Sequence, residues 1–324
     1  MKSSSRYFPV RLMVAEQSDG LAEDVYLLKP NNSDDKTVEL AVTHLSPLDA
    51  AFGSLRDRPV LILLHGQYQN RHVFWRGSDE SLGRKLVGAG IDVWLMEMRG
   101  HGLSAVNVDY ENHTLADTAR HDIPAVSQFV AEMSAERPVH WLGIGTGGGA
   151  LLMSVAAGAL MSLPVASVLG CGDPFGNAGW SRLPGLVSLV AGRLCRDDLV
   201  GPEMESYASI RNLIIESRKL SRRGAAMGID LWTQLAATDM SLGWISADQG
   251  LEWNERGLRN LYQQGSLELL EVAAESLDAL LSGRSTGGEQ QPGLPRQLVT
   301  WMNQGYRRER VDGVSGVGEV TPFA

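Results

Sequence analysis

The segment VHWLGIGTGGGALL, which covers Val139–Leu152, carries the residue pattern with the most chemical potential in this chain. An apolar run ends in a cluster of glycines, and small and apolar residues follow. This order predicts a strand, a sharp turn and a helix. The first N–H groups of such a helix lack backbone partners and attract negative charge. The turn therefore suits a nucleophile, a phosphate group, or a reactive site that has lost its reactive side chain.

A phosphate-binding loop has partial support from the glycine spacing. Gly143–Gly148 reads GIGTGG, which matches the dinucleotide fingerprint G-x-G-x-x-G. The acidic residue that the fingerprint places about twenty residues later is missing, because residues 163–170 read LPVASVLG. No lysine follows the glycines, so the P-loop spacing is absent as well. A nucleotide-binding enzyme that uses this loop remains an alternative hypothesis.

Imidazole and thiol groups are unevenly placed along the chain. Neither Cys171 nor Cys195 has metal-ligand spacing, and two cysteines make no disulfide framework. H-E-x-x-H and paired C-x-x-C motifs are absent, so we expect no metal and no cofactor. None of the seven histidines follows residue 140; they are His44, His65, His72, His101, His113, His121 and His140.

Composition and charge exclude several classes of partner. Acidic residues outnumber basic ones and the formal net charge is −9, which argues against nucleic acid as a partner. The N-terminal residues MKSSSRYFPVRLMV contain no apolar core of signal-peptide length, so we predict a cytoplasmic protein. Residues 150–170 are about long enough to cross a bilayer. They contain Pro164, however, and we predict a buried helix that ends at Leu163-Pro164, then a buried strand, and no transmembrane segment.

Strand-like and helix-like patterns alternate along most of the chain, which predicts a mostly parallel sheet with helices on its faces. Between residues 176 and 227, helical patterns are joined by loops with glycine and proline, as expected of an insertion. The strand-like segments are 6–15, 37–46, 58–66, 91–98, 138–145, 165–175, 228–239 and 267–273. The helix-like segments of the sheet region are 81–90, 117–136, 147–162, 257–265 and 296–310.

Four segments together resemble the α/β-hydrolase fold, close to its lipase, esterase and polyhydroxyalkanoate-enzyme branches. They are LLHG (Leu63–Gly66), DVWLMEMRGHGLS (Asp92–Ser104), HDIPAVSQFV (His121–Val130) and VHWLGIGTGG (Val139–Gly148). The resemblance implies a mostly parallel central sheet flanked by helices, with a helical cap insertion. On this basis residues 1–175 and 228–310 form the core, residues 176–227 the cap, and residues 311–324 a loose tail.

The same resemblance assigns roles to residues around the glycine turn. In this family the nucleophile is the serine of G-x-S-x-G, on a sharp turn between a strand and a helix. Gly143–Gly147 fills that pattern here, so Gly145 stands at the nucleophile position. Thr146 is a weak nucleophile candidate, because it lies one position too late. The backbone N–H groups of Thr146 and Gln67 match the two oxyanion donors of the family.

The histidine of the family's catalytic triad is also missing from its expected position, whereas both acid positions hold an aspartate. The family order is serine, then an acid, then a histidine after the last strand. In that place the sequence reads AESLDALL, with Glu275 or Ser276 where the histidine would stand. Asp239 and Asp173 match the family's two acid positions, beyond the seventh and the sixth strand, although Asp239 also suits a turn or a helix N-cap.

His65 and Gly66 match the family's loop at the rim of the pocket. A buried structural histidine, with both ring nitrogens hydrogen-bonded, is one interpretation of His65. In the alternative interpretation, His65 takes part in catalysis together with Thr146 or Asp239, in an arrangement that differs from the usual triad.

The favoured hypothesis is a pseudoenzyme of esterase or lipase ancestry. It would keep the scaffold and pocket without Ser-His-Asp hydrolysis, and would bind a small or acyl-containing ligand or a partner protein. An active ester hydrolase with a non-standard constellation and the nucleotide-binding enzyme are the alternatives. The oligomeric state stays open.

Overall fold

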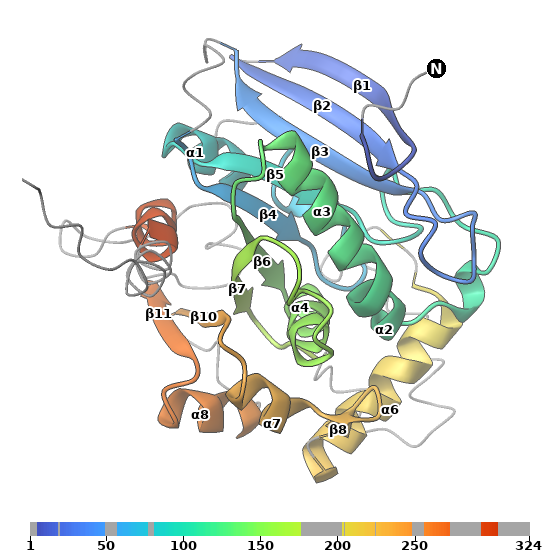
Figure 1. The fold of residues 1–324 in the computed structure, drawn as a ribbon, viewed down its shortest axis with the longest axis vertical. Helices are drawn as coiled ribbons and strands as arrows, with labels where there is room; N and C mark the ends of the chain where they lie inside the picture. Colours follow the sequence, from blue (N-terminus) through green and yellow to red (C-terminus); the bar gives the residue numbers. More distant parts are fainter. Residues whose placement is uncertain are drawn as a thin grey trace, which may run out of the picture.

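The structure, a computed structural model, describes residues 5–18, 20–48, 57–76, 81–175, 203, 205–223, 225–247, 256–272 and 293–303. Within these residues one nine-stranded sheet has the order β1-β2-β3-β5-β4-β6-β7-β10-β11 (Figure 1). The strands are β1 (Val10–Ser18), β2 (Leu21–Leu28), β3 (Leu40–Pro47), β4 (Val60–Leu64), β5 (Asp92–Met96), β6 (Val139–Ile144), β7 (Val165–Cys171), β10 (Ser241–Ala247) and β11 (Glu268–Val272). A separate pair joins β8 (Ala225–Ala226) to β9 (Ile229–Asp230).

The sheet is antiparallel from β1 to β5 and parallel from β5 to β11. The pairs β1–β2, β2–β3 and β3–β5 are antiparallel. The pairs β5–β4, β4–β6, β6–β7, β7–β10 and β10–β11 are parallel. The predicted mostly parallel sheet flanked by helices is therefore confirmed. Because β4, β6 and β7 run in the same direction, their carboxyl ends meet at one edge of the sheet.

Helices cover both faces of this sheet. Every residue of β4 is buried, and its side chains alternate between two apolar clusters. On one face lie α3 (Ile123–Met133), α4 (Thr146–Ala156), α7 (Leu231–Ala236) and α8 (Arg256–Gln263). The opposite face is covered by α1 (Leu82–Gly88) and a helix at 294–303. The remaining elements are η1 (Arg71–Val73), η2 (Tyr110–Asn112), α2 (Leu115–Asp117), the π-helical turn η3 (Thr118–Asp122) and α6 (Tyr207–Arg223).

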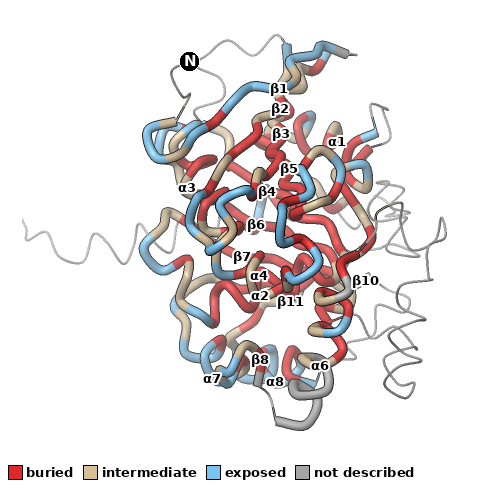
Figure 2. Tube along the Cα trace, turned by 90° about the vertical axis from the view of Figure 1, so that its right-hand side faces the viewer, coloured by how far each residue is buried: buried red, intermediate tan, exposed pale blue. Residues whose placement is uncertain are grey.

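The central strands are buried on both faces because they are continuous apolar runs. All residues of β4, β5, β6 and β7 are buried, and Figure 2 shows the burial continuing from strand to strand through the middle of the molecule. Such runs are typical of parallel strands covered by helices. The sequence prediction for these four strands is confirmed.

Three expectations about local structure were wrong. The sequence did not predict β2, because acidic residues interrupt its apolar pattern. Residues 228–239 do not form a strand that returns to the main sheet. Only Ile229–Asp230 is extended there, and it pairs with β8; the strand that joins the sheet is β10. The helix α4 ends at Ala156 rather than near Leu163, and turns lead from it to β7.

Other expectations concern the cap, the tail and the membrane. Of the predicted cap, residues 203, 205–223 and 225–227 are described; residues 176–202 and the predicted tail 311–324 lie outside the described residues. Among the helices that are described, none combines the length and the apolar character needed to cross a membrane. Pro124 lies in the first turn of α3, directly after the π-helical turn.

A buried ion pair ties the turn after β5 to the start of α3. Arg99 Nε donates to Asp122 Oδ2 at 2.8 Å, and Arg99 Nη2 donates to Asp122 Oδ1 at 2.7 Å. The Asp122 side chain is fully buried and that of Arg99 is 4% exposed. The two-bond geometry holds the guanidinium and carboxylate planes in one orientation.

Replacing Asp122 with alanine should strongly destabilise the fold. The substitution leaves the Arg99 guanidinium buried without its partner, which costs about 3–5 kcal/mol of unfolding free energy. Chemical denaturation measures this loss. As a control, Glu39→Ala removes the partner of the exposed Arg11 and should cost less than about 1 kcal/mol. Equal losses in the two variants would contradict this account.

Candidate functional site

The glycine turn has an unusual backbone conformation. Gly145 lies between β6 and α4 with φ 50° and ψ −120°, a combination that residues with a side chain adopt only at a cost. Its N–H donates to the Cys171 carbonyl at 2.7 Å, which joins the turn to the end of β7. A Cβ atom added at Gly145 would meet only the Asp173 carbonyl oxygen, at 3.5 Å. The turn therefore has room for a side chain that the sequence does not supply.

The neighbouring glycines are needed for close backbone packing. A Cβ at Gly143 would lie 2.5 Å from the Gly148 nitrogen. One at Gly147 would collide with the carbonyl oxygens of Leu64 and His65, and one at Gly149 with that of Pro174. Close backbone packing within the protein thus explains why glycine stands at these positions, and no phosphate ligand is needed to explain it. The geometry of this turn gives no further support to the nucleotide-binding hypothesis.

His65 is fixed by its backbone neighbours. Its ring is fully buried, with Nδ1 donating to the Gly66 carbonyl at 2.8 Å and Nε2 accepting from the Met98 N–H at 3.0 Å. Burial, together with the nearby His101, lowers the pKa of His65 to about 3. A neutral ring with both nitrogens occupied supports the structural interpretation of His65 over recruitment as a catalytic base.

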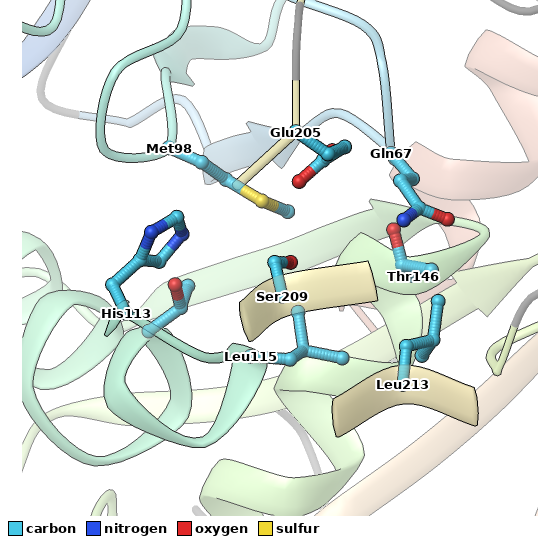
Figure 3. Close-up of a pocket in the computed structure, with 9 residues that line it drawn as sticks. Gln67, Met98, His113, Leu115, Thr146, Glu205, Ser209 and Leu213 are labelled. Atoms are coloured by element: carbon cyan, nitrogen blue, oxygen red, sulfur yellow. The ribbon is translucent and has the colours of Figure 1, made fainter. Parts of the chain in front are cut away.

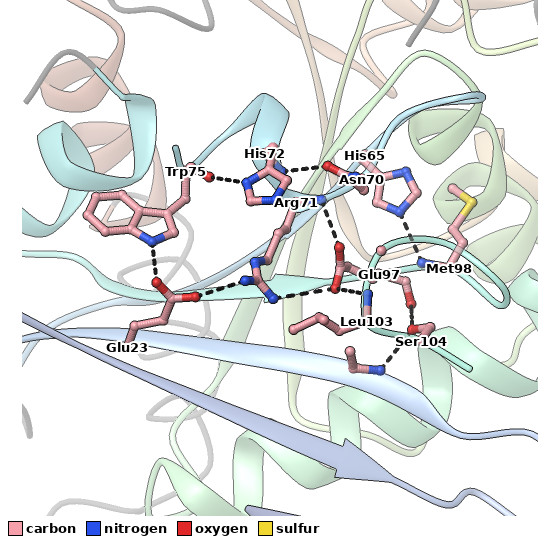
Figure 4. Close-up of polar contacts among 12 residues, drawn as sticks. Glu23, His65, Asn70, Arg71, His72, Trp75, Glu97, Met98, Leu103 and Ser104 are labelled. Carbon is pink, nitrogen blue, oxygen red and sulfur yellow. Dashed lines mark hydrogen bonds and ion pairs between the residues drawn. The ribbon is translucent and has the colours of Figure 1, made fainter. Parts of the chain in front are cut away.

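A buried polar network holds the loop that follows His65 (Figure 4). The backbone N–H groups of Arg71 and Leu103 donate to the Glu97 carboxylate at 3.2 and 3.0 Å. Arg71 also pairs with Glu23 at 3.1 Å, and Trp75 Nε1 donates to Glu23 at 2.6 Å. Burial raises the pKa of Glu97 above its ordinary value. The loop carrying Gln67 is thereby attached to the turn after β5 and to β2.

Two glutamates at the start of the described cap attach it to the same loops. Glu203 accepts from Asn70 Nδ2 at 2.6 Å and from the Gly102 N–H at 3.1 Å, and its own N–H donates to the Tyr68 carbonyl at 3.0 Å. Glu205 accepts from the Tyr68 N–H at 2.9 Å, and its Oε1 lies 3.3 Å from His101 Nε2. This segment therefore bridges the loop after β4 and the turn after β5.

Glu205 and His101 form a buried ion pair. Burial lowers the pKa of His101, but the Glu205 carboxylate, the Arg99 carbonyl and Glu203 together raise it by more, so the pKa lies above its ordinary value. Burial raises the pKa of Glu205, but His101 and the Tyr68 N–H lower it by more, to about 2. His101 Nδ1 donates to the Arg99 carbonyl at 2.9 Å, which leaves Nε2 for Glu205.

A small cavity, part of it open to solvent, lies between the glycine turn and α6. Gln67 and Thr146, the two residues predicted to supply oxyanion donors, both line it (Figure 3). The cap contributes Glu205 and, from α6, Ser209 and Leu213. Among the described residues, the cavity is lined by Gln67, Met98, His113, Leu115, Thr118, Thr146, Glu205, Ser209 and Leu213.

The predicted acids do not join this cavity. Asp239 precedes β10, and since β10 runs parallel to β7, this residue lies at the edge of the sheet opposite the glycine turn. The expected strand before it was wrong, and the residues that follow β10, 248–255, lie outside the described residues. Asp173 follows β7 beside Gly145, but its carboxylate accepts from the Phe175 N–H at 3.0 Å. Neither acid lines the cavity.

The last histidine of the chain is also placed away from the cavity. His140 is buried within β6, with its Nδ1 2.6 Å from Ser167 Oγ, and burial lowers its pKa to about 4. Positions 273–292, where the family expectation places a histidine, lie outside the described residues. No metal-binding group of three or more His, Cys, Asp or Glu side chains occurs among those that are described.

Sequence analysis missed the contributions of His113, Glu205 and Ser209. They come from separate loops and from the cap, and no spacing motif connects them. His113 Nδ1 donates to the Tyr110 carbonyl at 2.8 Å, and burial lowers its pKa. Only the path of the cap over the sheet edge brings these residues together.

The model of the "Alpha/beta hydrolase family" matches residues 61–303. This range contains the glycine turn, the loop after β4 and the described part of the cap. The chain belongs to the alpha/beta hydrolase family.

Similarity to individual relatives of this hydrolase-family chain is more limited. Gastric triacylglycerol lipase from Rattus norvegicus is 30% identical over 95 residues, which is 26% of this chain and 24% of the lipase. The chain thus spans about a quarter of the length of that curated relative. A soluble variant of monoglyceride lipase from Saccharomyces cerevisiae shares the fold with TM-score 0.53 and 13% identity, covering 94% of this chain and 98% of that one. Acetyl xylan esterase 1 from Thermoanaerobacterium sp. also shares the fold, with TM-score 0.51 and 16% identity, and the match covers 92% of this chain and 88% of the esterase.

Gly145→Ser should fold, because its Cβ would meet one carbonyl oxygen, that of Asp173, at an ordinary van der Waals distance. The cost should be the strain of a side chain at φ 50°, about 1–3 kcal/mol of unfolding free energy. Gly147→Ser is the matched variant two residues away, and it should lose more stability or fail to fold because its Cβ collides with two carbonyl oxygens. Thermal and chemical denaturation compare the two. A larger loss in Gly145→Ser would overturn the assigned turn geometry.

The Glu205–His101 pair should stabilise the fold over a limited pH range. Lowering the pKa of Glu205 from 4.5 to about 2 stabilises the fold above pH 4.5, and this contribution is lost as the pH falls towards 2. Raising the pKa of His101 above 6.5 stabilises the fold below pH 6.5, and this is lost as the pH rises through the folded value. The difference in unfolding free energy between wild type and Glu205→Gln should therefore be largest between about pH 4.5 and 6.5. A difference that does not change with pH would exclude an ionic pair.

Proposed function

We propose that this hydrolase-family chain holds a small acyl compound above Gly145 without cleaving it by a serine mechanism. The observation that carries the proposal is the Gly145 turn itself. It has φ 50° and ψ −120° and space for a side chain, yet glycine offers no atom that could attack a carbonyl. A pocket with this turn can bind an acyl group but cannot form an acyl-serine bond at that position.

The histidine distribution gives independent support. A serine mechanism needs an imidazole to accept the proton of the hydroxyl. The sequence contains no histidine after His140, whereas the family order places the catalytic histidine after the last strand. Both the nucleophile and the base of the family mechanism are thus missing from their expected positions in the sequence.

The cavity retains features that would bind a carbonyl group. Thr146 begins α4, and the first N–H groups of a helix have no partner within it. The backbone N–H groups of Thr146 and Gln67 are the proposed donors to the carbonyl oxygen. Met98, Leu115 and Leu213 supply apolar contacts for an acyl chain. A curated relative that matches part of this chain is named as a lipase, which motivates an acyl compound as the ligand class.

An active hydrolase that uses Thr146 is the second candidate, favoured by one observation. Thr146 lines the cavity, and its hydroxyl points toward the Gln67 side chain (Figure 3). His113 lines the same cavity, and its lowered pKa keeps the ring neutral. The two candidates differ in whether the pocket turns its ligand over.

The proposal predicts binding without turnover. Short acyl esters and amides should raise the melting temperature of the purified protein, with a stabilisation of about 2.7 kcal/mol at a hundredfold excess over Kd. A fluorophosphonate probe should label no residue, because no histidine is hydrogen-bonded to a hydroxyl group among the described residues of the cavity wall. Ester turnover that disappears in Thr146→Ala would reject the proposal in favour of the second candidate. Stabilisation by NAD(P) alone would instead favour a nucleotide ligand.

A further inference from the structure

The cap places a buried carboxylate in the wall of the cavity. Glu205 is 6% exposed, lines the cavity together with Gln67 and Thr146, and points into it in Figure 3. It accepts from the Tyr68 N–H at 2.9 Å. Tyr68 directly follows Gln67, so the carboxylate contacts the amide next to the proposed carbonyl donor. A ligand on that donor would therefore lie beside the Glu205 carboxylate.

The counter-ion of Glu205 does not face the ligand space. His101 is fully buried, lies 3.3 Å from Glu205 Oε1 and is not among the residues that line the cavity. A ligand would meet the negative end of this ion pair first. Buried charges interact strongly because little solvent screens them, so a second carboxylate there would be repelled.

Cations that could offset this repulsion are missing from the described cavity wall. Among the described lining residues, His113 is the one that could carry a positive charge, and burial lowers its pKa, which keeps the ring neutral at pH 7. Its Nδ1 hydrogen is already used by the Tyr110 carbonyl, at 2.8 Å. The backbone N–H donors alone would bind any carbonyl oxygen, including an oxygen of a carboxylate. The negative charge of Glu205 disfavours a ligand that carries a carboxylate.

The polar groups of the wall suit a ligand with both an acceptor and a donor. Gln67 Nε2 is buried and has no hydrogen-bond partner among the described residues. Together with the backbone donors it can serve a carbonyl oxygen, while the Glu205 carboxylate can accept an N–H. A carboxamide provides both groups on one carbon. An ester provides only the acceptor, and a site built for a donor discriminates against an analogue that lacks it.

We propose that this cavity selects uncharged carboxamides over carboxylates with the same chain, and that Glu205 determines the selection. The inference rests on the proposed function and adds to it the chemical class of the ligand. Met98, Leu115 and Leu213 contact the aliphatic chain of the amide, while its head group lies between Gln67 and Glu205.

The test compares hexanamide with hexanoate on the full-length protein at pH 7, by calorimetry or by ligand-observed NMR. Wild type should bind hexanamide at least about tenfold more tightly than hexanoate. In Glu205→Gln this ratio should fall to about threefold or less, because the amide side chain carries no charge. The methyl ester of hexanoic acid should bind wild type with an affinity between the other two.

Glu203→Gln is the matched control. Glu203 is two residues away and is also a hydrogen-bonded cap carboxylate, but it contacts Asn70 and Gly102 and does not line the cavity. This variant should keep the wild-type ratio of affinities. Thermal unfolding of both variants establishes that they are folded before their affinities are compared.

The outcomes separate this inference from the proposed function. Equal affinity of wild type for hexanamide and hexanoate would overturn the charge selection while leaving acyl binding in place. An unchanged ratio in Glu205→Gln, or an equal change in Glu203→Gln, would remove Glu205 as the determinant. Failure of wild type and both variants to bind any of the three compounds would overturn the proposed function, and this inference with it.

Discussion

The close approach of the first turn of α4 to the ends of β4 and β6 is the constraint on which the rest of the structure depends. Gly143 and Gly147 have no Cβ, and this lets the helix begin against the carbonyl groups of Leu64 and His65. The helix N-terminus then lies at the sheet edge where the parallel strands end. The cavity and the paths of the loops around it are arranged about this contact. Within the turn, Gly145 differs from these glycines because a Cβ there would make no contact shorter than 3.5 Å.

Buried polar groups connect that edge to the loops above it. Glu97 and Arg71 join the loop after β4 to the turn after β5, and Glu203 and Glu205 join both to the cap. Each of these carboxylates accepts at least one backbone N–H, which compensates for the loss of water around it. The cap is thus attached to the body by charge-assisted hydrogen bonds as well as by apolar contacts. One of these carboxylates, that of Glu205, also lines the cavity and gives its wall a negative charge.

The sequence predicted the central strands well and the flanking elements less well. Continuous apolar runs made β4, β5, β6 and β7 recognisable, because few other structures bury both faces of such a run. The strand β2 has an irregular burial pattern with acidic residues on its partly exposed positions, so its sequence resembles a loop. Residues 228–239 were misassigned because an apolar stretch of that length suits either a strand or a short helix. The Asp230 side chain accepts from the Thr233 N–H as an N-cap, and this favours the helix α7.

The sequence by itself determined the positions of glycine and histidine: Gly145 at the turn and no imidazole after His140. These are properties of residue identity and order, and they need no coordinates. Tertiary structure decided that Gly145 keeps room for a side chain, that both nitrogens of His65 are occupied, and that Asp239 lies at the far edge of the sheet. It also brought Glu205 into the cavity wall, 137 residues along the chain from Tyr68. Contacts between such distant segments depend on how helices and strands pack, and no local pattern of residues encodes them.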